Sequence, residues 1–238
     1  MNRLRIYHSL PGWAKSAAAS IEGWRLSRLR YGVETQGWVD DAHAREAWSP
    51  DQWIDWQSSR MRSLLRDASL HVAFYREHWG DEAGTRVTED IRNWPILEKH
   101  SVRAAPERFV SDRADSARLR HTFTSGSTGS PMKVYWSAET ARRWYALFEA
   151  RWRNWHGVKL QDRWAIIGGK QIVHSEVRKP PYWVFNHGMN QLYLSAYHIR
   201  RESAAAYVDA IDRYGVKYVY SYTSGVYALA RSMLESGI

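Results

Sequence analysis

The sequence contains no cysteine, so it cannot form disulfide bonds, a thiolate zinc site or a cysteine nucleophile. It also lacks a run of about 18 apolar residues, the length that a helix needs to span a bilayer. Near the N-terminus, Pro11, Lys15 and Glu22 interrupt the stretch that would be apolar in a secretory signal. These absences predict a protein without a disulfide scaffold or a transmembrane segment, and they favour a cytoplasmic location.

Charge is abundant but not concentrated. Lysine and arginine number 34 against 25 acidic residues, a net charge of +9, yet basic and acidic residues alternate and no zinc-finger or RNA-recognition motif occurs. We therefore expect no nucleic-acid partner; a basic surface also suits attraction of ATP. With 238 residues and 44% hydrophobic content, the chain is long enough for one large or two small domains.

The local pattern changes along the chain. Residues 1 to about 95 have helical periodicity, and Ser49, Pro50 and Asp51 form a helix start with Ser49 as the cap. From about 110, apolar runs and helical segments alternate, which is typical of an α/β sheet. We predict a helical region over 1–109 and a partial α/β domain over 110–238. Strands are expected at 118–123, 133–136, 164–167, 191–196 and 216–220, and helices at 138–157, 204–214 and 223–235.

The helix predicted from Ser137 to Gly157 carries aromatic residues at helical spacing, namely Trp144, Phe148, Trp152 and Trp155. Spacings of four, four and three residues place them on one side, which predicts a stripe that faces the core. Arginines interleave with them, a mixture that also occurs where bases stack between phosphate contacts. Amphipathic packing is the favoured interpretation.

A glycine-rich run, TSGSTGSPMK, occupies residues 124–133. Its glycines, Gly126 and Gly129, allow backbone N–H groups to turn toward an anion, its hydroxyls are uncharged donors, and Lys133 supplies a positive charge. The P-loop of NTPases does not fit, because that motif needs a lysine directly after the second glycine and a helix that starts there. Here Ser130 and Pro131 follow Gly129, and the flanks resemble strands. The run is either a loop for nucleotide phosphates or an ordinary polar hairpin turn.

The run resembles the signature loop of the adenylate-forming superfamily, which includes acyl-CoA synthetases, aryl-CoA ligases and adenylation domains. The common form ends Gly-x-Pro-Lys, whereas Met132 stands before Lys133 here. An apolar residue after the proline is similar to the branch of phenylacetate-CoA ligase-like and CapK-type capsular polysaccharide proteins. Other segments that resemble this branch are LPGWAKSAAASIEGWRLSRLRYG at 10–32, LLRDASLHVAFYREHW at 64–79, PILEK at 95–99, GGK at 168–170 and PPYWVFNHGMNQLYLSAYHI at 180–199.

The resemblance implies ATP-dependent, AMP-forming activation of a small-molecule carboxylate, with ATP and Mg²⁺ as cofactors and CoA as a candidate acceptor. It also implies a helical region followed by the adenylate-forming α/β sheet. In the family, a later Tyr-Gly-x-x-Glu segment, a ribose-binding Asp and a C-terminal Lys complete the site, and we expect these beyond Ile238. No catalytic residue is therefore assigned. The phosphate contacts implied by position are Thr124, Ser125, Gly126, Ser127, Thr128, Gly129 and Lys133.

Weaker candidates lie in the second half of the chain. Trp183, Asn186 and Tyr197 fall in a segment that resembles the branch and are candidates for an acyl pocket, although simple packing of amphipathic aromatic residues is the favoured interpretation. His174 and His187 lack the pairing that a metal site or a catalytic base would show, so no metal site is predicted.

Two functions remain open on the sequence. One is the N-terminal half of a carboxylate ligase in capsular or surface polysaccharide metabolism. The other is a truncated, non-catalytic module that binds nucleotide or a partner. The α/β pattern is expected to stop within the sheet, which predicts self-association through an incomplete sheet edge.

Overall fold

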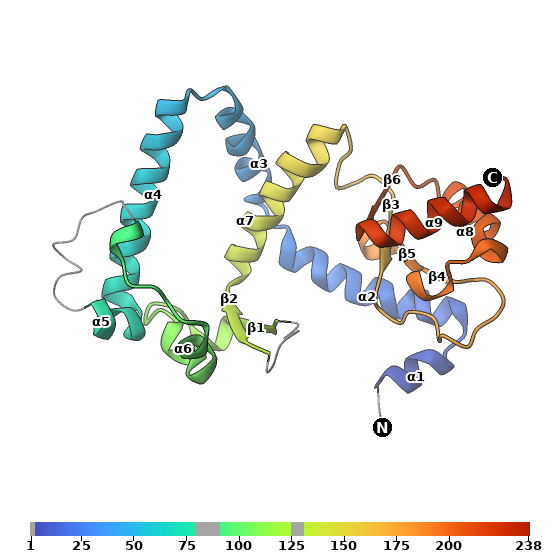
Figure 1. The fold of residues 1–238 in the computed structure, drawn as a ribbon, viewed down its shortest axis with the longest axis horizontal. Coiled ribbons are helices and arrows are strands. Elements are labelled where there is room, and N and C mark those ends of the chain that lie inside the picture. Colours follow the sequence, from blue (N-terminus) through green and yellow to red (C-terminus); the bar gives the residue numbers. More distant parts are fainter. Residues whose placement is uncertain (1–2, 80–90, 125–130) are drawn as a thin grey trace. The chain divides into compact units, whose positions relative to one another are not determined.

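The computed structural model describes residues 3–79, 91–124 and 131–238. Within these residues the chain is a mixed α/β protein that forms two compact units (Figure 1). Unit 1 combines the residues up to Glu34 with those from Tyr145 to Ile238, and unit 2 consists of Thr35–Trp144. The predicted boundary at residue 109/110 marks the change from helices to strands along the sequence; as a statement about domains it stays a prediction.

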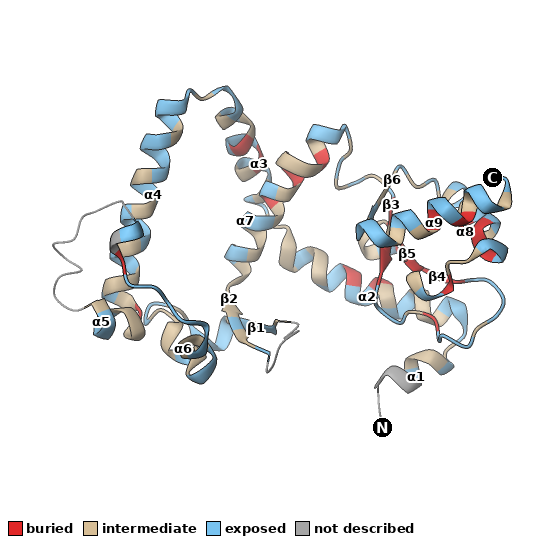
Figure 2. Ribbon diagram, viewed as in Figure 1, coloured by how far each residue is buried: buried red, intermediate tan, exposed pale blue. Residues whose placement is uncertain are grey.

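Unit 1 contains a four-stranded sheet in the order β4-β5-β3-β6. Strand β3 pairs in parallel with both β5 and β6, and β4 pairs antiparallel with β5. The buried residues concentrate on this sheet and on the helices next to it (Figure 2). The strands are β3 (Trp164–Gly168), β4 (Trp183–Asn186), β5 (Gln191–Ser195) and β6 (Tyr218–Ser221), and the helices are α1 (Arg3–Ser9), α2 (Gly12–Arg30), α8 (Ala204–Arg213) and α9 (Thr223–Ser236).

Helices cover both faces of this sheet. Because successive side chains of a strand point to opposite faces, Phe185 on β4 stacks on Tyr214 after α8, while Asn186 faces Gly23 of α2. The core side holds Ile167 and Leu194 from the strands with Tyr207 from α8 and Leu229 from α9, all of them buried. The arrangement is the layered α/β architecture that the alternating pattern predicts.

Unit 2 is mostly helical and contains a separate two-stranded hairpin. The cap predicted at Ser49 is confirmed: its hydroxyl accepts from Gln52 N–H, the Gln52 side chain accepts from Ser49 N–H, and Pro50 is the first helical residue. The elements are α3 (Thr35–Ala44), α4 (Pro50–His71), α5 (Ala73–Trp79), α6 (Lys99–Ala104), β1 (Arg120–Phe123), β2 (Lys133–Trp136) and α7 (Ala138–Phe148), the last of which continues across the unit boundary.

The helix predicted up to Gly157 changes its geometry on the way. An α-helix covers Ala138–Phe148, a π-helix covers Glu149–Arg153, and a 3₁₀ turn ends at Gly157 with φ of +70°. The core-facing stripe was wrong for two of its four members, since Trp144 and Trp155 are exposed. The buried side is occupied instead by Ala146, Glu149, Ala150 and Arg153, and the π-helix shifts the helical phase before Trp155.

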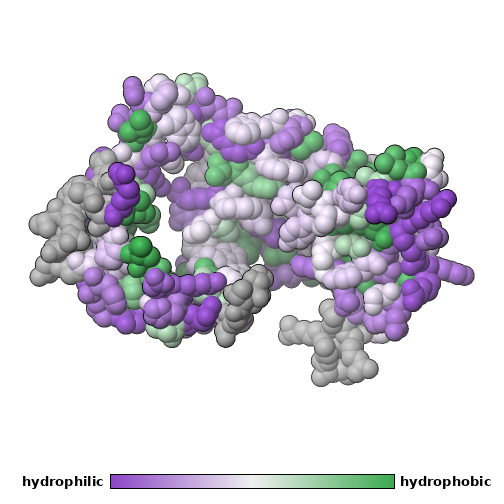
Figure 3. Space-filling model, in the orientation of Figure 1, coloured by the Kyte–Doolittle hydropathy of each residue, from purple (hydrophilic) through white to green (hydrophobic). Residues whose placement is uncertain are grey.

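On the face shown in Figure 3, hydrophobic residues are scattered among hydrophilic ones over both units. Helix α4, for example, buries none of its residues, although its apolar positions have helical periodicity. No helix in the described parts of the chain is both long and apolar enough to cross a membrane.

Candidate functional site

The glycine-rich run connects the two strands of the hairpin in unit 2. Strands β1 and β2 pair antiparallel, with Phe123 opposite Lys133 and Arg120 opposite Trp136. The run therefore joins strand to strand, as the sequence predicts, and not strand to helix as in a P-loop. The predicted phosphate contacts Ser125, Gly126, Ser127, Thr128 and Gly129 lie outside the described residues, and their roles stay predictions.

The base of this loop is closed by one pair of residues. The Thr124 N–H donates to the Met132 carbonyl, and the Met132 N–H donates to Thr124 Oγ1, both at 3.0 Å. Met132 thus pairs across the hairpin with Thr124, and Lys133, the next residue, is the first residue of β2. The additional residue before the lysine is therefore accommodated in the pairing with Thr124.

Lys133 lies beside a carboxylate and a phenol. Its Nζ is 3.4 Å from Glu107 Oε1 and 4.6 Å from the centre of the Tyr135 ring, and the Tyr135 hydroxyl donates to the same Glu107 oxygen at 3.0 Å. Interaction with Tyr135, followed by that with Glu107, raises the pKa of Lys133. The side chain therefore remains an ammonium group at neutral pH, which is the state that a phosphate contact requires.

Glu107 is positioned by a short 3₁₀ helix, Pro106–Phe109, which packs on α5. The Phe109 ring stacks on Phe74 with centroids 4.3 Å apart, and Arg108 forms an ion pair with Glu77. The Glu107 carboxylate accepts from its own backbone N–H and from Tyr135, which lowers its pKa and keeps it ionised. Sequence reasoning missed Glu107, because it stands 26 residues before its lysine partner.

The predicted acyl-pocket residues all lie in unit 1, each with different partners. The Trp183 ring meets Tyr207 edge to face at 6.3 Å, the buried Asn186 faces Gly23, and the Tyr197 hydroxyl donates to the Gly169 carbonyl at 2.8 Å. Among the described residues, these contacts do not join any one of the three to another. Their packing roles are evident, and a pocket formed by them stays a prediction.

Tyr197 does lie at the edge of the sheet where α/β proteins bind ligands, outside the carboxyl ends of parallel strands. There β3 ends at Gly168, where an added Cβ would lie 2.4 Å from the Tyr193 hydroxyl. The absence of a side chain lets this hydroxyl accept from Lys170 N–H at 3.3 Å. Tyr193 and Tyr197 therefore fix the Gly168–Lys170 turn at this edge.

The two histidines considered from the sequence, His174 and His187, are not buried, whereas His198 is. The His174 side chain is half exposed, and the His187 ring packs edge to face on Phe185 at 4.7 Å. The buried residue is His198, whose Nδ1 is 2.8 Å from Ser195 Oγ and whose Nε2 is 3.2 Å from the His174 carbonyl. In the described part of the chain, no group of three or more acidic or histidine side chains could hold a metal ion.

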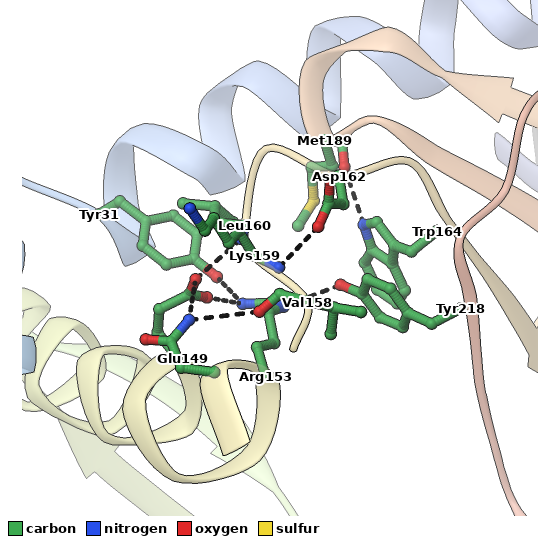
Figure 4. Close-up of polar contacts among 11 residues, drawn as sticks. Tyr31, Glu149, Arg153, Val158, Lys159, Leu160, Asp162, Trp164, Met189 and Tyr218 are labelled. Carbon is green, nitrogen blue, oxygen red and sulfur yellow. Dashed lines mark hydrogen bonds and ion pairs between the residues drawn. The ribbon is translucent and has the colours of Figure 1, made fainter. Parts of the chain in front are cut away.

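A buried ion pair is the other polar feature that sequence reasoning missed (Figure 4). In the π-helix of unit 1, Arg153 donates to Glu149 at 2.8 Å, to the Tyr218 hydroxyl at 2.9 Å and to the Tyr31 hydroxyl at 3.2 Å. Leu160 N–H also donates to the Glu149 carboxylate, at 2.8 Å. The local signal is a glutamate four residues before an arginine, a spacing that also occurs in exposed pairs on helix surfaces.

The comparisons with known proteins give one relative for the whole chain. The sequence is 24% identical to Protein CapK of Staphylococcus aureus over 237 residues, which is 98% of this chain and 51% of the relative. The chain thus spans about half the length of the curated relative it matches. No protein-family model and no solved structure matches it. The chain is similar to Protein CapK along its entire length, and the adenylate-forming likeness remains one of motifs.

Proposed function

We propose that this chain carries the ATP-phosphate-binding part of an AMP-forming carboxylate ligase of the acyl- or aryl-CoA ligase kind. The observation that carries the proposal is the position of the glycine-rich run between two paired strands, with Lys133 as the first residue of β2. Backbone N–H groups, hydroxyls and an ammonium are the donors that a polyphosphate needs. The reaction would join a small-molecule carboxylate to the α-phosphorus of ATP and release pyrophosphate.

The proposed reaction uses ATP as a co-substrate and Mg²⁺ as its metal cofactor, with CoA as a candidate acceptor. The hydroxyl-rich run and Lys133 would hold phosphate oxygens, and ATP supplies the leaving pyrophosphate when bound. Mg²⁺ is usually held by substrate phosphates and one or two carboxylates. The proposal therefore needs no closed protein cage for the metal in the described residues.

We extend the proposal to capsular or surface polysaccharide biosynthesis. Its support is the similarity to Protein CapK over 98% of the chain. Because this chain covers 51% of that relative, the activity proposed for residues 1–238 alone is limited to nucleotide binding. Carboxylate activation is proposed for a protein that also contains the remaining family motifs.

Calorimetric titration of residues 1–238 with ATP and Mg²⁺ tests the loop directly. We expect the Gly126→Val/Gly129→Val variant to lose binding, since valine side chains block the approach of backbone N–H groups to phosphate. The matched control is Gly12→Val/Gly37→Val, where an added Cβ meets nothing within 4 Å. Equal affinities for the loop variant and the wild type would disprove the assignment.

A second pair of variants tests the contribution of the Lys133 charge to ATP binding. Lys133→Ala should weaken ATP binding more than Lys217→Ala, because both lysines pair with a carboxylate but only Lys133 adjoins the loop. Carboxylate-dependent exchange of pyrophosphate into ATP then separates the two functions. Binding without exchange by the protein that carries all motifs favours the alternative, a non-catalytic nucleotide-binding module.

A further inference from the structure

Helix α2 of unit 1 is held to the sheet by its smallest residues. Ser20 and Gly23 are buried, and the Ser20 hydroxyl accepts from His187 N–H at 3.0 Å. An added Cβ on Gly188 would lie 2.3 Å from the Trp24 backbone nitrogen, so helix and turn approach at backbone distance. Attachment of α2 to the sheet therefore does not require its large side chains.

Large apolar side chains of α2 are exposed beside this attachment. Trp13, Ile21 and Trp24 are 77%, 66% and 54% exposed. At about 100° per residue, these positions together with Arg25 and Arg28 fall within about one third of the helix circumference. Ile21, Trp24, Arg25 and Arg28 line a shallow open depression. Two indoles and two guanidinium groups thus share one exposed side, which we call the α2 face.

The surrounding sequence concentrates positive charge. Residues 1–30 contain six basic residues and a single acidic one, Glu22, so their net charge is +5 of the +9 carried by the whole chain. Glu22 is itself bound to Arg25, at 2.6 and 2.8 Å. Of the six basic residues, Arg25 and Arg28 lie on the α2 face, and Arg25 is the partner of Glu22. The face therefore combines apolar rings with two arginines and one paired carboxylate, in a segment with excess positive charge.

We propose that the α2 face binds peripherally to an anionic phospholipid surface. Indole rings favour the head-group layer of a bilayer, where one end of the ring is apolar and the other wet. Arginines beside them can keep their apolar stems against the rings while their guanidinium groups contact lipid phosphates. The helix lies on the surface and does not span it.

The intermingling of apolar and basic residues sets the depth of this contact. Deeply inserting amphipathic helices separate their apolar and charged faces, whereas α2 carries both on one side. Such a face suits the head-group layer, with attraction by charge and anchoring by the indoles. A protein partner would have to offer an acidic surface with pockets for two indoles, and lipid phosphates meet the same chemistry without pockets.

Vesicle co-sedimentation of the full chain tests the proposal. We expect binding to phosphatidylcholine vesicles that contain roughly one third phosphatidylserine, no binding to pure phosphatidylcholine, and weakening by salt. Arg25→Gln/Arg28→Gln should lower the partition coefficient by roughly five-fold per arginine, since each basic residue near such a surface contributes about that factor. Trp13→Ala/Trp24→Ala should abolish binding.

The matched control is Trp155→Ala/Arg231→Gln, which removes an exposed tryptophan and an exposed arginine from other helices of unit 1. It should bind vesicles as the wild type does. Absence of wild-type binding to anionic vesicles, or equal losses in the control and the α2 variants, would overturn the proposal. A larger molecular mass in solution for the wild type than for the α2 variants would also overturn it. That result would identify the α2 face as a contact between copies of this chain.

Discussion

Replacement of Arg153 by methionine should destabilise unit 1 strongly. Only 4% of the Arg153 side chain and 11% of the Glu149 side chain are exposed, and the two groups are 2.8 Å apart. Burial works to lower the pKa of Arg153, but Tyr31 and Glu149 outweigh it and the pKa is raised. The guanidinium is therefore charged whenever the unit is folded.

The size of the effect follows from what the substitution leaves behind. In Arg153→Met, the Glu149 carboxylate keeps the Asn154 amide and the Leu160 N–H as donors but loses its counter-charge. Removal of one partner of a buried ion pair typically costs about 3–5 kcal/mol. The double variant Glu149→Gln/Arg153→Met should recover much of this loss, because no uncompensated charge remains buried.

Native-state hydrogen exchange of β3 and β5 peptides is the appropriate assay, because it reports the opening free energy of unit 1 separately from unit 2. Arg231→Met is the matched control: Arg231 also pairs with a glutamate four residues away, at 2.7 Å, but both side chains are exposed. The control should leave exchange unchanged. A loss below about 1 kcal/mol for Arg153→Met, or a double variant as unstable as the single one, would refute the reasoning.

Two further predictions concern unit 1. Burial lowers the pKa of His198 and favours its neutral form in the folded state. The contribution of His198 to stability is therefore complete above the unfolded-state pKa of about 6.5. It is lost as the pH falls below that value. Exchange protection should therefore decline between about pH 7 and 5, less steeply in His198→Asn, and an unaltered slope in this variant would contradict the assignment. Gly23→Ala should lower the stability of unit 1 by about 1–3 kcal/mol in the same assay, since its Cβ would lie 2.0 Å from the Asn186 amide oxygen. The control Gly12→Ala, whose Cβ lies in open space, should leave stability unchanged. Equal effects of the two substitutions would show that α2 can shift freely.

Much of the fold could be predicted because its signals are local. The Ser49 cap requires only Pro50 and Gln52, and helices end at Gly157, Gly215 and Gly237 because each has a positive φ that other residues adopt with strain. Strands β3 and β5 were identified from apolar runs of the expected length. These features depend on neighbours in sequence, which is where pattern reasoning works best.

The errors have equally specific causes. The stripe through Trp144 and Trp155 was derived from a regular 3.6-residue period, which the π-helix at Glu149–Arg153 interrupts before Trp155. A buried glutamate and arginine also look like solvent-facing residues in any hydropathy pattern. Strand β4 was missed because it has only four residues, WVFN, and only Tyr182 separates it from Pro180 and Pro181.

The candidate site also has features that the sequence predicts and features that depend on tertiary packing. Composition identified the glycine-rich run, and pairing of its flanks placed it in a hairpin, with Thr124 and Lys133 at its base. Sequence could not reveal Glu107, or that Tyr31 reaches Arg153 across 122 residues. Such partners come together only through tertiary packing, and no local period encodes them.

The hairpin setting also determines where the positive charge of a phosphate site must come from. In a P-loop, a helix begins at the second glycine and its N-terminus contributes to anion binding. Here β2 follows the run instead, and a strand has only a small net dipole. Under the proposed function, electrostatic attraction at this loop therefore depends on the ammonium group of Lys133. That dependence is the physical reason why Lys133→Ala should weaken nucleotide binding even though the backbone donors of the loop remain.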